Sequence, residues 1–280
     1  MSMKKRALQI ALFLVIMLLT FYALFSGRDL SEIGHALMNM SFWYLIPSVA
    51  LAVFFVCAEG FMIWYLLRSM KAHKEGYKAS SLSRCIQYSF IGFFYSGITP
   101  SATGGQPVQL YYMNKDGNRG SDSTVVLMTV AVAYKFVLVV MGLGILLFWM
   151  NPLRQELGNY FPLYLLGLAL NVILVILILG VMLFPKVILK LALLFEGLFI
   201  RLKIWKPSEK REEKINDFID SYQQAVTWLK VHKGSLAVVI LVTFLQRCSV
   251  FVLTYMVYLG FGLHGAGAMK VILLQAAVYI

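Results

Sequence analysis

The amino-acid sequence predicts an all-α fold: a polytopic integral membrane helical bundle with a re-entrant hairpin and amphipathic surface helices. Hydrophobic residues make up 60% of the 280 residues and charged residues only 14%, and the mean hydropathy of +0.77 is far above that of soluble domains. Several apolar runs are long enough to cross about 30 Å of hydrocarbon. Because these runs are continuous rather than alternating, they exclude a transmembrane β-barrel.

The first apolar run, residues 7–25, follows Lys4, Lys5 and Arg6. It is longer than the apolar part of a secretory signal peptide and no A-x-A site follows it, so we expect a signal anchor. We expect residues 1–280 to form a single transmembrane domain, with further spans at 43–67, 124–150, 161–184 and 235–260 and a partial span at 269–280.

The distribution of basic residues predicts the orientation. Lys and Arg exceed Asp and Glu by 25 to 13, which gives a formal charge of +12. Most basic residues lie in the connections 68–84 and 186–233, whereas 26–42, 151–160 and 261–268 carry only Arg28 and Arg154. By the positive-inside rule, the two basic connections and the N-terminus should face the cytoplasm at the cell (plasma) membrane. The positive charge favours anionic lipid as a partner, and no nucleic acid binding is expected.

The segment 85–113 is expected to form a re-entrant hairpin. The spans at 124–150 and 161–184 already form one out-and-back pair between the two basic connections. The segment 85–113 must therefore cross the membrane twice or not at all. Its apolar part, Cys85 to Thr99, measures roughly 22 Å as a helix, too short to cross before the breaks in "PSATGG". Irregular backbone at membrane depth lines cavities and often forms transporter substrate sites. The alternative is a polar loop at the membrane interface.

Three ionisable residues, Glu59, Lys135 and Arg247, lie far from any span end. Each costs at least about 2.5–3.5 kcal/mol within a membrane unless it is paired or faces a polar cavity. Glu59 could pair with Lys135 or Arg247 and hold helices together. Alternatively, the three charges and the turn enclose a lipid head group, with the surplus cation binding a phosphate. The candidate substrate-binding residues are therefore Thr99, Ser101, Thr103, Gly104, Gly105, Gln106, Gln109, Glu59, Lys135 and Arg247, and the same cavity could include Tyr111, Tyr112 and Tyr134.

Two segments outside the spans have helical apolar spacing. In the basic segment 186–233, Ser208 is a candidate N-cap, and one helix face carries Ile215, Phe218, Ile219, Tyr222, Val226 and Leu229. This helix should lie on the inner leaflet or pack under the bundle, with a solvated basic face that sets topology favoured over a dedicated lipid-binding site. The segment 29–40, "DLSEIGHALMNM", predicts a shorter amphipathic helix on the outer face.

No catalytic residues, cofactor or metal site are predicted. The four histidines are solitary, no HExxH or Walker A sequence is present, and Cys57, Cys85 and Cys248 lack metal-ligand spacing. We interpret the cysteines as reduced packing residues. No segment outside the spans exceeds about fifty residues, so no separate catalytic domain is expected.

The stretch 100–117, "PSATGGQPVQLYYMNKDG", resembles the membrane domain of lysylphosphatidylglycerol synthases and their stand-alone flippase-like relatives. The resemblance covers essentially the whole chain. It implies movement of lysylphosphatidylglycerol to the outer leaflet and hence resistance to cationic peptides. In the full synthases, a C-terminal cytoplasmic domain transfers lysine from charged tRNA to phosphatidylglycerol, and these residues contain no such domain. Family members usually continue to a second Pro-Gly-Gly-type break, so a C-terminal truncation at "ILLQAAVYI" is expected.

These observations leave three functional hypotheses. The first is a lipid translocator that moves an anionic or aminoacylated phospholipid between leaflets. The second is a membrane component that presents lipid to a separately encoded transferase, such as a phosphatidylglycerol lysyltransferase, and so contributes to lipid metabolism. The third is a structural membrane partner whose buried charges serve only helix packing. Without an ATP site, translocation would use passive exchange, proton coupling or the membrane potential.

Overall fold

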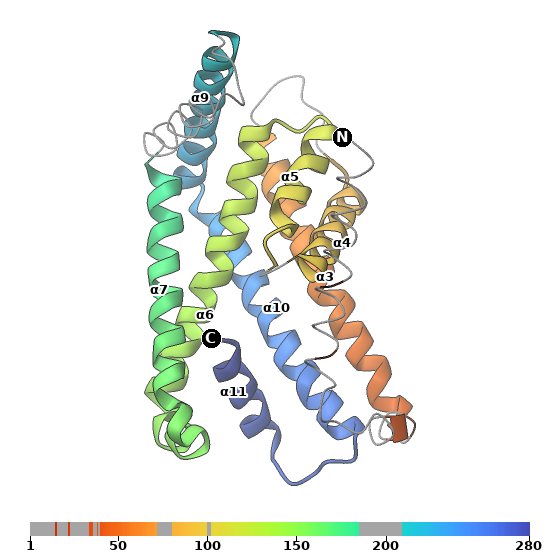
Figure 1. Cartoon of the computed structure of the whole chain (residues 1–280). Helices are drawn as coiled ribbons and strands as arrows, with labels where there is room; N and C mark the ends of the chain where they lie inside the picture. Colours follow the sequence, from red (N-terminus) through yellow and green to blue (C-terminus); the bar gives the residue numbers. More distant parts are fainter. Residues whose placement is uncertain are drawn as a thin grey trace.

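The computed structural model describes residues 40–71, 80–99, 102–184 and 209–280, together with residues 15, 22, 34, 35 and 38. Within these ranges all regular structure is helical, which confirms the prediction of an all-α membrane protein (Figure 1). The predicted first span at 7–25, most of the predicted outer helix at 29–40, and residues 185–208 lie outside the described residues.

Four long helices run lengthwise through the bundle (Figure 1): α3 (Phe42–Lys71), α6 (Gly120–Leu157), α7 (Phe161–Leu183) and α10 (Lys233–Gly260). Three stretches are long and apolar enough to cross a membrane, namely Phe42–Met70, Gly120–Leu183 and Lys233–Gly260. The second of these stretches comprises α6 and α7, which form an antiparallel pair. The long helices therefore coincide with four of the expected spans, and the short α11 (Ala268–Tyr279) coincides with the expected partial span.

Helix α6 continues through most of the connection expected at 151–160. Its backbone departs from helical geometry at Trp149, with φ −137° and ψ 21°, and then resumes to Leu157. Pro152 follows this kink within one helical turn, where a missing N–H costs little, so the proline continues the helix after the break. The sequence pattern therefore marked a kink in α6 rather than its end.

The segment expected to form the hairpin folds as two short helices, α4 (Leu82–Ile98) and α5 (Gly105–Lys115), which pack against each other. At about 1.5 Å per residue they measure roughly 26 and 16 Å, too short to cross about 30 Å of hydrocarbon. The turn between them lies part-way along the bundle, while both outer ends lie at the same end of the molecule (Figure 1).

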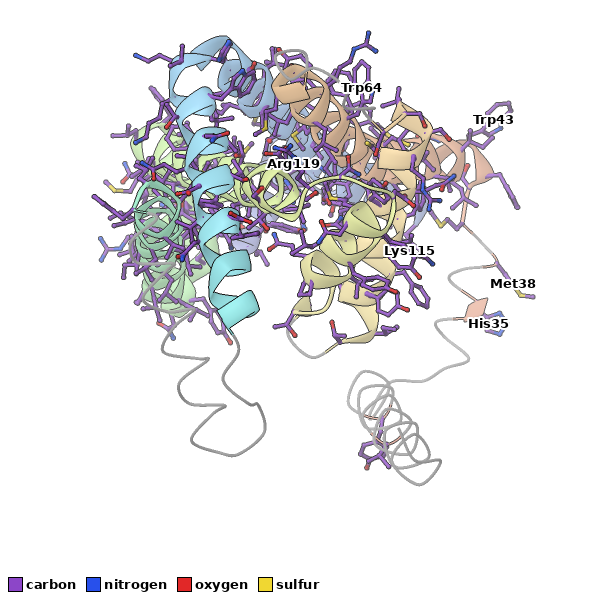
Figure 2. The ribbon with its side chains drawn as sticks, turned by 90° about the horizontal axis from the view of Figure 1, so that it is seen from above. His35, Met38, Trp43, Trp64, Lys115 and Arg119 are labelled. Atoms are coloured by element: carbon purple, nitrogen blue, oxygen red, sulfur yellow. The ribbon has the colours of Figure 1, made fainter. Side chains whose placement is uncertain are left out.

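Polar contacts join the two outer ends of the hairpin. Arg84 donates to both carboxylate oxygens of Asp116, from Nε to Oδ2 at 2.5 Å and from Nη2 to Oδ1 at 3.0 Å. Tyr88 donates its hydroxyl to Asp116 Oδ2 at 2.5 Å. These contacts hold the pKa of the Asp116 carboxyl below its ordinary value, mainly through the Arg84 hydrogen bond. Figure 2 looks onto this end of the bundle, where Lys115 and Arg119 flank the connection from α5 to α6.

Helix α9 (Glu209–Val231) packs against α6 and α10 at the same end of the bundle. Its buried side chains are Ile219, Tyr222, Ala225, Val226 and Leu229. Tyr222 donates its hydroxyl to the Met182 carbonyl oxygen of α7 at 3.4 Å. The predicted apolar face is therefore part of the core, as expected for a helix that packs under the bundle. Ser208 and the side chain of Ile215 lie outside the described residues.

Candidate functional site

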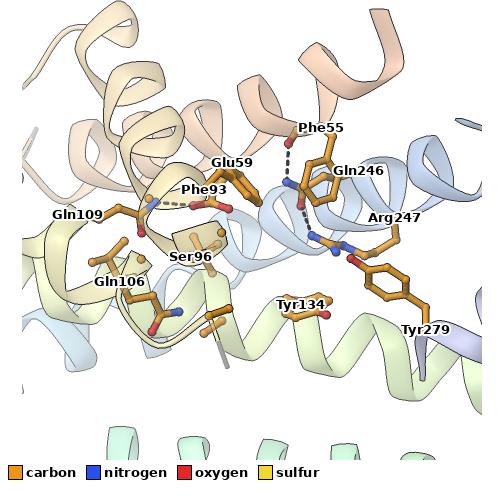
Figure 3. Close-up of a pocket in the computed structure, with 17 residues that line it drawn as sticks. Phe55, Glu59, Phe93, Ser96, Gln106, Gln109, Tyr134, Gln246, Arg247 and Tyr279 are labelled. Carbon is orange, nitrogen blue, oxygen red and sulfur yellow. Dashed lines mark hydrogen bonds between the residues drawn. The ribbon is translucent and has the colours of Figure 1, made fainter. Parts of the chain in front are cut away.

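A cavity of about 520 Å³ lies where the hairpin turn meets α3, α6, α10 and α11. We call it the head-group cavity, after the ligand expected there from the sequence. Figure 3 shows its side chains converging from these five parts of the chain. The polar members of the lining are Glu59, Ser96, Gln106, Gln109, Tyr134, Gln246, Arg247 and Tyr279. The N-terminus of α5 also lies at this cavity, since Gly105 and Gln106 line it, and the α5 dipole adds partial positive charge there.

Glu59 is held by the returning helix of the hairpin. Gln109 Nε2 donates to Glu59 Oε1 at 2.7 Å, and the Gln109 side chain is only 3% exposed. Gln109 can occupy this position because Gly92 of α4 faces it: a Cβ on Gly92 would overlap the Gln109 side chain. Gly60 allows a similar close approach of α3 to α4, since its Cβ would lie 2.6 Å from Ile86 Cα. Two glycines therefore place the carboxylate of α3 against the hairpin.

Arg247 is fixed between aromatic rings. Its guanidinium carbon lies 4.6 Å from the ring centre of Phe55, 4.2 Å from that of Tyr134 and 6.0 Å from that of Tyr279. Such cation–π contacts contribute about 2 kcal/mol or more when the cation is desolvated. The residue is 5% exposed. The rings therefore hold a cation at a depth where water provides little stabilisation.

The hydrogen bonds of Arg247 leave its Nε donor without a partner in the part of the chain that the structure describes. Its Nη2 donates to Gln246 Oε1 at 3.1 Å, and Gln246 Nε2 donates to the Phe55 carbonyl oxygen at 2.7 Å. The buried Nε has no hydrogen-bond partner among the described residues. Buried donors without a partner are rare in folded proteins and often mark the place of a ligand or water.

Lys135 does not line the head-group cavity. Its Nζ donates to Asn171 Oδ1 of α7 at 3.0 Å. No ion pair joins Glu59 to Lys135 or Arg247 in the described part of the chain. Direct pairing of Glu59 with one of these cations is therefore not seen among the described residues, although Glu59 and Arg247 line the same cavity. Amide side chains contact each of the three charges instead: Gln109 at Glu59, Gln246 at Arg247 and Asn171 at Lys135.

The predicted turn residues divide into two groups. Gly105, Gln106 and Gln109 line the cavity. Thr99 and Gly104 shape the turn, because Thr99 Oγ1 accepts from the Gly104 amide at 2.9 Å and donates to the Tyr95 carbonyl oxygen at 2.7 Å. Thr103 is not among the lining residues, and Ser101 lies outside the described residues. Of the three tyrosines considered, Tyr134 lines the cavity, whereas Tyr111 and Tyr112 pack on each other outside it.

Sequence reasoning missed several lining residues, among them Phe55, Ser96, Gln246 and Tyr279. Two of them had a usable signal. Gln246 adjoins Arg247 in an apolar span, and Phe55 precedes Glu59 by four residues and so shares its helix face. The completed site contains a carboxylate and a guanidinium that are held separately, with amides and hydroxyls around them. It can bind a polar ligand that carries a phosphate together with hydroxyl or cationic groups.

Comparison with known proteins identifies one family. The model of the family described as "Lysylphosphatidylglycerol synthase TM region" matches residues 6–280. This range includes every residue that lines the head-group cavity. No curated protein and no solved structure matches the chain.

Proposed function

Because the chain belongs to the lysylphosphatidylglycerol synthase transmembrane-region family, we propose that it is a flippase-like lipid translocator. Its cargo is an anionic or aminoacylated phospholipid, such as lysylphosphatidylglycerol, that moves between leaflets. The observation that carries this proposal is the head-group cavity, where the hairpin turn brings Glu59 and Gln109 into the same cavity as the partly unpaired Arg247.

The cavity supports this function through its charge arrangement. Arg247 Nε donates to a phosphate oxygen of the head group, and the surrounding rings keep the guanidinium in place when no lipid is bound. Glu59 and Gln106 interact with hydroxyl or ammonium groups of the same head group. Since the site has low polarity around it, each of these interactions is stronger than in water. The acyl chains remain in the surrounding lipid.

The proposed orientation places the basic end of the bundle in the cytoplasm. Arg84, Lys115 and Arg119 lie at this end, together with the outer ends of α4 and α5. By the positive-inside rule, this arrangement gives a plasma-membrane protein with a cytoplasmic N-terminus and a hairpin that enters from the inner face. Delivery of an aminoacylated lipid to the outer leaflet would make the cell surface more positive and so lower its affinity for cationic peptides.

A second candidate function follows from the family description, which names a synthase. In that case the head-group cavity presents phospholipid to a separately encoded transferase at the cytoplasmic face. This function requires lipid binding but no movement between leaflets. The two candidates therefore differ in one measurable quantity, the rate of lipid exchange produced by the purified chain alone.

A leaflet-resolved assay in liposomes tests the proposal. Liposomes that contain lysylphosphatidylglycerol, with or without purified protein, are exposed to an amine-reactive reagent that does not cross the bilayer. We expect the protein to increase the fraction of lysylphosphatidylglycerol that becomes labelled. Phosphatidylcholine with a reporter head group serves as the control cargo. Unchanged sidedness of lysylphosphatidylglycerol would exclude its translocation and favour the presentation function.

A further inference from the structure

A second cavity, of about 240 Å³, lies where α6, α7, α9 and α10 meet. It shares no lining residue with the head-group cavity. Apart from Thr129 and Lys230, its lining side chains are apolar. The Thr129 hydroxyl is already used, since it donates to the Val125 carbonyl oxygen at 2.7 Å. Lys230 is therefore the polar group of this cavity that remains available to a ligand.

The packing of the helices explains why this space exists. Among the described helices, α7 packs extensively only against α6 and its short connecting helix η2 (Gly158–Tyr160). Helix α9 is joined to the end of α7 by the bond from Tyr222 to the Met182 carbonyl oxygen. The side chains of α7 and α10 consequently face each other across a gap that α9 bounds at the basic end. Phe136 and Leu183 line this gap and are 41% and 37% exposed, so the cavity opens on the apolar outer surface of the bundle.

The position of Lys230 identifies the chemistry of the occupant. This exposed lysine lies at the rim of the cavity, at the C-terminal end of α9, and the exposed Lys233 begins α10 three residues later. An occupant must therefore combine a long apolar part, which fills the aliphatic slot, with an anionic group that remains at the basic rim. A phospholipid of the adjacent leaflet has both parts. Basic residues near a membrane surface attract anionic lipid by about 1 kcal/mol each, which corresponds to about fivefold in affinity.

We propose that this cavity binds one acyl chain of an anionic phospholipid, with Lys230 at the phosphate. The bound chain fills the space between α7 and α10, so the lipid acts as a structural ligand that completes the packing of α7. This site is separate from the cargo site. A result for or against lipid binding at this site therefore says nothing about the proposed translocation. Failure of translocation would likewise not count against this site.

Native mass spectrometry tests the proposal with two lipids of identical acyl chains, phosphatidylglycerol and phosphatidylcholine, each titrated against the whole chain in detergent. For Lys230→Gln we expect the preference for phosphatidylglycerol to fall by about fivefold. Lys115→Gln is the matched control, because Lys115 lies at the same end of the bundle over the Tyr112 ring and does not line the cavity. Lipid in the head-group cavity contributes equally to both variants and cancels in their comparison.

A second variant tests the slot itself. Ala133 is buried and lines the cavity, so Ala133→Leu places a side chain where the acyl chain would lie. We expect this variant to lose the most tightly held phosphatidylglycerol. An unchanged lipid preference in Lys230→Gln would overturn the proposal, and so would an equal loss in Lys115→Gln. Because Lys230 is exposed, its substitution keeps the test valid even if Ala133→Leu does not fold.

Discussion

Gly105 is the position in the hairpin where one added methyl group should have the largest effect. A Cβ at this position would lie 2.7 Å from the Gly92 carbonyl oxygen and closer still to Ser96 Oγ. One of these atoms belongs to the backbone of α4, so rotation of a side chain cannot relieve the overlap. Gly105→Ala therefore forces α4 and α5 apart at the point where both line the head-group cavity.

The expected cost is that of overpacking, about 1–3 kcal/mol in the free energy of unfolding. Gly97→Ala is the matched control, because it lies in the same hairpin and no atom lies within 4 Å of its added Cβ. Within α4 that substitution should be neutral or stabilising by up to about 1 kcal/mol, since alanine favours helix over glycine. The double variant Ser96→Ala/Gly105→Ala should recover part of the loss, because it removes the hydroxyl but not the backbone contact.

The assay is denaturant-induced unfolding of the four proteins in detergent, followed by circular dichroism, with lipid exchange in liposomes measured in parallel. We expect Gly105→Ala to lower both the unfolding midpoint and the exchange rate. If Gly105→Ala and Gly97→Ala unfold at the same midpoint, the two helices are not in the close contact described and the geometry of the cavity is wrong.

Three further predictions concern separate parts of the molecule. Arg247→Ala should lower the rate of lipid exchange at least about tenfold, the equivalent of one lost charge-assisted hydrogen bond. Arg247→Lys should restore little of that rate, because an ammonium lacks the planar set of donors of a guanidinium. Equal rates for the unsubstituted protein and both variants would contradict this prediction. The pKa of Asp116 is lowered in the folded protein, so its contribution to stability is complete above the ordinary value of about 3.9 and is lost as the pH falls through the lower folded value. The unfolding midpoint of Asp116→Asn should therefore change less between neutral and acid pH than that of the unsubstituted protein. An equal change in both proteins would count against the Arg84 contact. Single cysteines replacing Lys115 and Tyr160 should react with impermeant thiol reagents from the cytoplasmic and outer faces respectively, and labelling of both from one face would refute the topology.

The long helices could be predicted because their length and apolar composition alone determine them. The hairpin was predictable for a different reason: charge counts limit the number of crossings, and Pro100 with Gly104 and Gly105 breaks the helix before it can span. What the sequence could not give is the rotation of each helix about its axis. In a span that is apolar on every side, such as α7, hydrophobic periodicity is too weak to show which face meets the protein.

That limit explains the outcome for the three buried charges. Glu59 and Arg247 line one cavity, as expected, but Lys135 contacts Asn171 of α7 instead. The adjacent tyrosine, Tyr134, lines the cavity in its place. One residue along a helix is a rotation of about 100°, and the sequence alone does not show which of two neighbours faces inward. Two of the aromatic rings around Arg247, those of Phe55 and Tyr279, were missed for the same reason, since they and Tyr134 come from three different helices.

Asn171 also bears on how the protein assembles during synthesis. Its amide nitrogen donates to the Ile280 carbonyl oxygen, across 109 residues of sequence, while its amide oxygen accepts from Lys135. Before α11 has been made, Asn171 can bond only to Lys135 of α6 and to the Gly167 carbonyl oxygen of its own helix, and the bond to Ile280 must wait. Interhelical hydrogen bonds in membranes average about 0.6 kcal/mol each, enough to bias the angular position of α7 but not to fix it. The newly inserted pair should therefore sample several rotations in the bilayer, and the late arrival of α11 selects one of them.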